Sequence, residues 1–277
     1  MGGMDVPSVV LNNGIEMPQL GFGVWRVPPE QTHEAVSTAL KVGYRHIDTA
    51  KLYGNERAVG EAIADSGLDR DAVFVTSKVW NDDHGYDATL RAFDASMDRL
   101  GFDVLDLYLI HWPRPAAGTA SDTWRAMERL YRDGRIRAIG VSNFSPADLR
   151  RLMNTAEVMP AVNQVELHPY LQQRETRRTD AELEIATEAW SPLAKGGELL
   201  SDEVVTPIAD KHGKSPAQVV LRWHLQTGII AIPKSVTPSR IEENIDVFDF
   251  ELDAADLAAI ESLDRNGRTG PDPRQVV

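Results

Sequence analysis

Four polar side chains that could transfer a proton lie at the ends of short apolar runs in this sequence. Asp48 ends one such run, and Tyr53 lies in the segment that follows it. Lys78 and His111 lie near the ends of the next two runs. A tyrosine with a pKa near ~10 is a weak acid at neutral pH, and a nearby ammonium group is expected to lower that pKa. A carboxylate keeps such an ammonium charged, so the group predicts a general acid for a developing alkoxide.

Each of these residues also has a structural interpretation. Asp48 alone could cap the following helix, and Tyr53 could be an aromatic residue of a surface rim. His111, between Ile110 and Trp112, could be a buried core histidine. The sequence contains no H-E-x-x-H pattern and no second histidine close to His111, so no metal site is predicted. The joint occurrence of the four favours catalysis, with His111 orienting a carbonyl oxygen or sharing a proton relay.

Eight short runs rich in Val, Ile and aromatic residues must position these side chains. They are bounded by Gly, Asp or Pro, which predicts buried strands at 20–25, 44–50, 73–80, 104–112, 136–144, 161–168, 184–193 and 228–235. Segments with helical period lie between most of them, at 28–43, 87–101, 121–134 and 145–157. Strands that alternate with helices in this way predict a (β/α)8 TIM barrel, whose functional groups gather at the carboxyl ends of the strands.

Some segments depart from a plain eightfold repeat. An N-terminal β-hairpin is predicted around Asn13-Gly14, and the charged segment 169–183 predicts a short sixth helix. Two helices are expected after the seventh strand, the second with a Ser-Pro start, and further helix at the C-terminus. An open doubly wound sheet is the alternative, but no strand is followed by G-x-G-x-x-G. No linker divides the chain, so residues 1–277 are expected to form one domain.

Composition limits the classes of partner. Hydrophobic residues make up 42% of the 277 and charged residues 26%, enough to bury a sizeable core. The net charge of −13 argues against binding to nucleic acid. The absence of cysteine excludes disulfides, thiolate metal sites and a cysteine nucleophile. With no signal peptide and no apolar run of about 18 residues, we expect a soluble cytoplasmic protein that engages no membrane.

Five motifs together resemble the aldo-keto reductases: DTAKLYGNE, TSKVW, IHWP, GVSNF and IPKSVTPSRIEEN. The similarity runs from GFGVW to about Leu263, and the segment EAWSPLAKGG is most similar to the bacterial diketogluconate reductase branch. The resemblance implies reduction of aldehydes and ketones to alcohols, with hydride supplied by a nicotinamide cofactor. Tyr53 would be the general acid, supported by Lys78 and Asp48, and His111 would position the carbonyl.

The resemblance also implies where the cofactor lies. Ser142, Asn143 and Gln164 would hold the carboxamide, and Trp190 would stack on the nicotinamide ring. Two cations and a hydroxyl near one helix N-terminus match the positions that bind the 2′-phosphate of the adenine ribose; these are Lys234, Arg240 and Ser235. NADPH is therefore favoured over NADH. The remaining implied contacts are Gly23, Val24, Trp25, Ser191, Pro192, Leu193, Val236, Glu243 and Asn244.

Substrate would meet His111 and three tryptophans at strand ends, which are Trp25, Trp80 and Trp112. The pocket loops at 81–86, 113–121 and 194–203 carry little pattern. The tail 264–277 is rich in Gly and Pro and is expected to be mobile, either as a short flap over the mouth or as a frayed end. A short tail favours an open site that accepts small aldehydes, α-dicarbonyls and keto-sugars in a monomeric enzyme. The rival functions are a cofactor-binding regulatory subunit and a metal-dependent barrel hydrolase.

Overall fold

The barrel predicted from the alternation of strands and helices is confirmed. The computed structural model describes residues 6–276, in which eight parallel strands follow one another in chain order. They are β3 (Phe22–Gly23), β4 (His46–Asp48), β5 (Phe74–Val79), β6 (Leu105–Ile110), β7 (Ile136–Ser142), β8 (Val162–Glu166), β9 (Ala186–Trp190) and β10 (Ile230–Ala231). A parallel bridge between Leu20 and Ala231 joins the two ends of the sheet, so the barrel closes.

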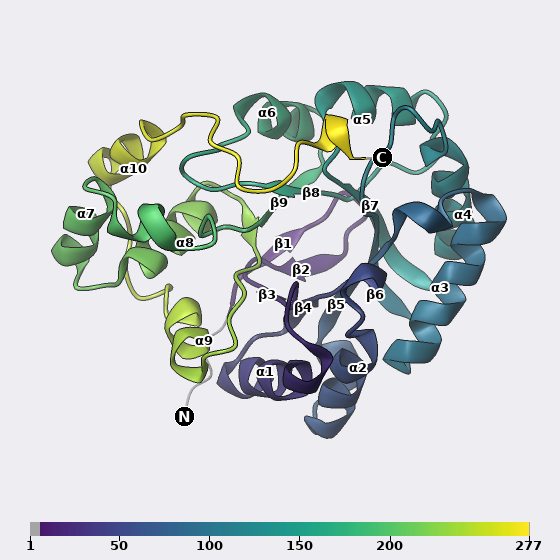
Figure 1. Cartoon of the computed structure of the whole chain (residues 1–277), viewed down its shortest axis with the longest axis horizontal. Coiled ribbons are helices and arrows are strands. Elements are labelled where there is room, and N and C mark those ends of the chain that lie inside the picture. The colour runs from purple at the N-terminus through teal and green to yellow at the C-terminus, as the bar shows by residue number, and fades with distance from the viewer. Residues whose placement is uncertain (1–5, 277) are drawn as a thin grey trace.

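Within residues 6–276, ten helices surround the strands (Figure 1). They are α1 (Pro29–Val42), α2 (Glu56–Asp65), α3 (Tyr86–Leu100), α4 (Ala120–Arg132), α5 (Pro146–Met153), α6 (Arg174–Glu182), α7 (Val205–His212), α8 (Pro216–Gln226), α9 (Pro238–Ile245) and α10 (Ala254–Glu261). The short α6 and the pair α7 and α8 agree with the sequence, as do the added helices α9 and α10. Ser145 and Ser215 each form a capping box ahead of a proline, which fixes where α5 and α8 begin.

The predicted N-terminal hairpin is also confirmed. Strand β1 (Ser8–Val10) pairs with β2 (Glu16–Pro18) in antiparallel register, and Gly14 turns the chain at a φ of +83°. The hairpin buries Leu11 and Met17 in one cluster with Phe74, at the start of β5, and with Ile230. It therefore covers the amino-terminal end of the barrel, opposite the predicted site.

The interior of the barrel is polar near the site. Gln164 on β8 hydrogen-bonds to Asp48 on β4 and to Glu188 on β9, and β4 lies across the ring from β8. These contacts can form only inside the barrel, where branched apolar residues are the usual filling. Polar side chains buried at such a position have to satisfy one another by hydrogen bonding. Among residues 6–276 no helix is both long enough and apolar enough to cross a bilayer.

Candidate active site

One buried ammonium group joins three of the predicted residues. Lys78 Nζ donates to Asp48 Oδ1 at 2.6 Å and to the backbone oxygen of Thr49 at 3.0 Å. It also lies 3.3 Å from the hydroxyl of Tyr53. Asp48 and Lys78 are both buried, at the ends of neighbouring strands, and Tyr53 follows in a turn that ends at Gly54. The geometry brings together the acid, the ammonium and the carboxylate that the sequence predicts.

The net shift of the Tyr53 pKa is opposite to the one expected from the sequence. Burial raises the pKa of Tyr53 to about 12, and the opposing effect of the Lys78 ammonium is smaller. Burial is the largest single effect on Lys78 and would lower its pKa, but Asp48, Tyr53 and Glu188 together outweigh it, and the pKa of the ammonium is raised. Tyr53 is therefore protonated throughout the neutral range. It can donate its proton to an alkoxide, which is a much stronger base.

His111 lies beside this group as a neutral ring. Its centroid lies 5.8 Å from that of Tyr53 and 5.2 Å from that of Trp80, and it is parallel to Trp112 at 6.3 Å. Burial, the charge of Lys78 and the neighbouring His84 hold the pKa of His111 well below its ordinary value. A neutral imidazole can orient a carbonyl oxygen, whereas it is a poor proton donor at neutral pH. Of the two roles left open by the sequence, orientation is the one this environment favours.

The residues expected around the carboxamide form a connected network. Ser142 Oγ donates to the backbone oxygen of Gln164 at 2.8 Å. Asn143 donates from Nδ2 to the His111 backbone oxygen at 3.0 Å, and its Oδ1 accepts from Trp190 Nε1 at 2.8 Å. Asn143 adopts a φ of +64°, which turns its amide into this position. The Asn143 amide thus links His111 to the Trp190 ring.

The cations predicted to bind a phosphate are exposed at the N-terminus of α9. Neither Lys234 nor Arg240 forms an ion pair or side-chain hydrogen bond with another residue of the 6–276 range, so both charges are available. Ser235 is buried, and its Oγ accepts from the Thr237 amide at 3.1 Å. Two unpaired cations beside the amides of a helix N-terminus fit a phosphomonoester. The chemistry of this donor set agrees with the cofactor that the resemblance implies.

The other implied cofactor contacts are less accessible. Gly23 and Val24 are buried, and their amides donate to the backbone oxygens of Pro233 and Asp48. Pro192 and Asn244 are buried as well, while the Glu243 carboxylate accepts from Ser215, which caps the N-terminus of α8. Partly or well exposed positions remain at Trp25, Ser191, Leu193 and Val236. The Glu243 carboxylate therefore already has a partner.

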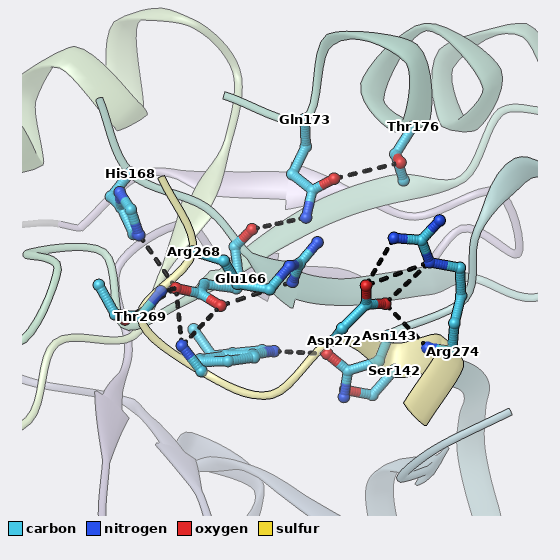
Figure 2. Close-up of polar contacts among 12 residues, drawn as sticks. Ser142, Asn143, Glu166, His168, Gln173, Thr176, Arg268, Thr269, Asp272 and Arg274 are labelled. Carbon is cyan, nitrogen blue, oxygen red and sulfur yellow. Dashed lines mark hydrogen bonds and ion pairs between the residues drawn. The ribbon is translucent and has the colours of Figure 1, made fainter. Parts of the chain in front are cut away.

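One buried carboxylate accepts several hydrogen bonds from the C-terminal segment at the barrel mouth (Figure 2). Glu166, at the end of β8, accepts from the amide of Thr269 at 2.5 Å, from its hydroxyl at 2.7 Å and from the amide of Gly270 at 3.0 Å. His168 Nε2 lies 3.1 Å from the same carboxylate. Figure 1 shows the yellow segment running from α10 across the carboxyl ends of β8 and β9 towards α5. The tail expected to be mobile is held at this point.

Substitution of Gly270 tests whether the tail packs on the predicted nicotinamide platform. A Cβ at Gly270 would overlap the Trp190 ring and come 3.0 Å from Glu166 Oε2. Gly270→Ala is therefore expected to lower the free energy of unfolding by about 1–3 kcal/mol and to shift tryptophan emission. Urea unfolding followed by fluorescence measures both. Gly267→Ala is the matched control, because its Cβ meets mainly the Arg265 side chain at 3.3 Å; equal effects would contradict the packing.

Two buried carboxyl groups of the site were not predicted. Glu188 lies two residues before Trp190 on β9, and Glu166 lies two residues after Gln164 on β8. Alternate residues of a strand face the same side, so both share the inward face with a predicted residue. That spacing of two was the signal in the sequence that could have identified them.

Comparison with known proteins agrees with this geometry. The sequence pattern of the aldo/keto reductase family matches residues 18–265. The chain belongs to the aldo/keto reductase family. It is 52% identical to a protein named glyoxal reductase from Bacillus subtilis (98% of this chain, 97% of that one) and 48% identical to one named methylglyoxal reductase DkgA from Escherichia coli K12 (97% and 98%). A crystal structure of a Gox0644 variant in complex with NADPH superimposes with a TM-score of 0.95 at 50% identity, covering 99% of this chain and 100% of that chain.

Membership of the family confirms the resemblance stated from the five motifs, including the likeness to the diketogluconate reductase branch. This aldo/keto reductase is an oxidoreductase, and its reaction class is the reduction of aldehydes and ketones to alcohols. The matched region contains both the buried ammonium group and the exposed cations of α9.

Proposed function

We propose that this aldo/keto reductase uses NADPH to reduce small aldehydes, α-dicarbonyls and keto-sugars, with Tyr53 as the proton donor. The observation that carries the proposal is the buried Lys78 ammonium, which binds Asp48 and Tyr53 beside the neutral ring of His111. The relatives named glyoxal reductase and methylglyoxal reductase support α-dicarbonyls as a substrate class. The half-exposed Trp25 and Trp80 and the buried Trp112 supply apolar surface for a small carbonyl compound.

In this mechanism the bound cofactor supplies the hydride, and the chain supplies position and a proton. Ser142, Asn143 and Gln164 would hold the cofactor's carboxamide, and Trp190 would pack against its ring. His111 orients the carbonyl oxygen towards the hydroxyl of Tyr53. Tyr53 donates its proton as negative charge develops on that oxygen, and the Lys78 ammonium stabilises the phenolate that remains.

We propose further that NADPH is preferred over NADH through the exposed cations of α9. Arg240→Ala is expected to raise the Kd for NADPH about 10- to 100-fold, because a charge-assisted hydrogen bond to phosphate is lost. The Kd for NADH, which lacks the 2′-phosphate, is expected to change less than about twofold. Arg151→Ala, an exposed arginine on α5, is the control. Fluorescence titration with both cofactors decides the matter, and equal losses for the two would contradict the assignment.

The first experiment follows NADPH absorbance with methylglyoxal, a nitrobenzaldehyde and a diketogluconate, with NADH in parallel. Turnover with NADPH supports the proposal, and the order of rates ranks the substrate classes. Strong preference for one carbonyl would contradict the broad tolerance expected from the sequence. Tight binding of NADPH without turnover would favour the regulatory subunit. The hydrolase needs clustered metal ligands, and residues 6–276 hold no group of three or more His, Asp or Glu side chains arranged for a metal ion.

We propose that the protein acts as a cytoplasmic monomer, with a single domain over residues 1–277 and with neither nucleic acid nor membrane as partner. The net charge of −13 supports the absence of a nucleic-acid partner. Light scattering on the eluting protein tests the oligomeric state. A mass of 30.7 kDa is expected, and twice that mass would contradict it.

A further inference from the structure

A second carboxyl group lies behind the catalytic residues and has no part in the proposed mechanism. Glu188, on β9, is fully buried, and its Oε2 accepts from Gln164 Nε2 at 2.8 Å. The same nitrogen donates to Asp48 Oδ2 at 2.7 Å. Asp48 in turn binds Lys78 through its other oxygen. Glu188 is thus connected through the Gln164 amide to Asp48, and through Asp48 to Lys78.

These contacts determine which way the Gln164 amide points. The amide nitrogen carries two hydrogens, and the two carboxyl groups accept both. Only the amide oxygen of Gln164 is left to accept a hydrogen bond from a bound carboxamide. Without Glu188 one N–H would be buried without an acceptor, and Asp48 alone would hold the orientation of the amide.

The charges that face Glu188 favour its neutral form. From β4 it faces Asp48 and His46, whose Nε2 lies 3.6 Å from Glu188 Oε1, and from β5 it faces Lys78. Lys78 is already paired with Asp48, and burial lowers the pKa of His46 to about 3, so His46 offers no positive charge. Burial, and then the charge of Asp48, raises the pKa of Glu188 to about 8. With Glu188 neutral, the Lys78 ammonium faces the carboxylate of Asp48 and no second negative charge on Glu188.

We propose that Glu188 is a positioning residue, whose neutral carboxyl group fixes the amide of Gln164 so that its oxygen faces the cofactor carboxamide. This rests on the proposed function, in which Gln164 holds that carboxamide. Glutamine has the same shape as a protonated glutamate and can accept the same hydrogen bond. Methionine has similar length but accepts no such bond. The two replacements therefore separate the neutral hydrogen-bond acceptor from the volume of the side chain.

The experiment compares Glu188→Gln and Glu188→Met with the unaltered protein. Glu188→Met is expected to raise the Kd for NADPH about 10-fold, the loss of one buried hydrogen bond, whereas Glu188→Gln stays within about twofold. Tryptophan fluorescence quenching measures these constants. Asp180→Asn, another buried carboxyl group whose partners are Asn163 and Thr187, is the matched control and is expected to leave NADPH binding unchanged.

A readout without cofactor tests the neutral form itself. A carboxyl group whose pKa is higher in the folded than in the unfolded state binds an extra proton on folding, so the free energy of unfolding falls as pH rises between about 4.5 and 8. Glu188→Gln is expected to show a shallower fall than the unaltered protein across this window. Urea unfolding at several pH values measures the difference, and it remains informative if Glu188→Met does not fold.

Three results would overturn the inference. They are unchanged NADPH affinity in Glu188→Met, a loss in Glu188→Gln as large as in Glu188→Met, and equal pH slopes of unfolding for Glu188→Gln and the unaltered protein. The second and third would each show that Glu188 is ionised. Failure of the unaltered protein to reduce any carbonyl in the same assays would instead refute the proposed function.

Discussion

Replacing Tyr53 by Phe is expected to lower kcat by about 10²- to 10⁴-fold, the usual contribution of a positioned general acid. The Kd for NADPH is expected to stay within about twofold, since the ring remains and only a hydroxyl at the mouth is lost. Absorbance assays give kcat, and fluorescence titration gives the Kd. Tyr131→Phe, on α4, is the control for the loss of a tyrosine hydroxyl elsewhere.

Residual turnover near that of the unaltered protein would show that another group donates the proton. His111 would be the next candidate by position, although its pKa lies well below the neutral range because of burial and the charge of Lys78. A parallel loss of NADPH affinity would indicate that the hydroxyl holds the cofactor rather than the substrate.

Replacing Lys78 by Met is expected to lower the free energy of unfolding by about 3–5 kcal/mol at pH 7, besides abolishing turnover. The reason is that Asp48 would stay buried with no cation to pair with, and removing one partner of a buried pair leaves an uncompensated charge. The double replacement of Asp48 by Asn and Lys78 by Met removes both charges and is expected to recover part of this loss.

Urea unfolding of the single and double variants measures the two values. Equal instability of single and double variants would show that altered packing, and not charge, causes the loss.

The sequence predicted the elements of the barrel because each carries a local signal. Asp48 and Lys78 could be placed together since both end a strand, and parallel strands end on one edge of a barrel. The net pKa of Tyr53 could not be predicted, because its sign depends on how far burial exceeds the effect of the ammonium. Glu188 begins the segment EAWSPLAKGG, but it was missed because no local pattern shows that it meets Gln164; only its spacing from Trp190 placed it on the inner face. The anchoring of the tail to Glu166 is a contact between distant segments with no local pattern.

The hairpin at the amino-terminal end of the barrel has a consequence for the catalytic cycle. Leu11 and Met17 cover that end with apolar side chains, and the polar side chains that surround Lys78 inside the barrel are all buried; they are Asp48, Gln164 and Glu188. A tyrosine that gives up its proton once per turnover must be reprotonated before the next, and we expect the water that does so to come from the side where the substrate enters. The departing alcohol and the incoming proton would therefore share one entrance, and Tyr53 would regain its proton as the alcohol leaves the barrel mouth.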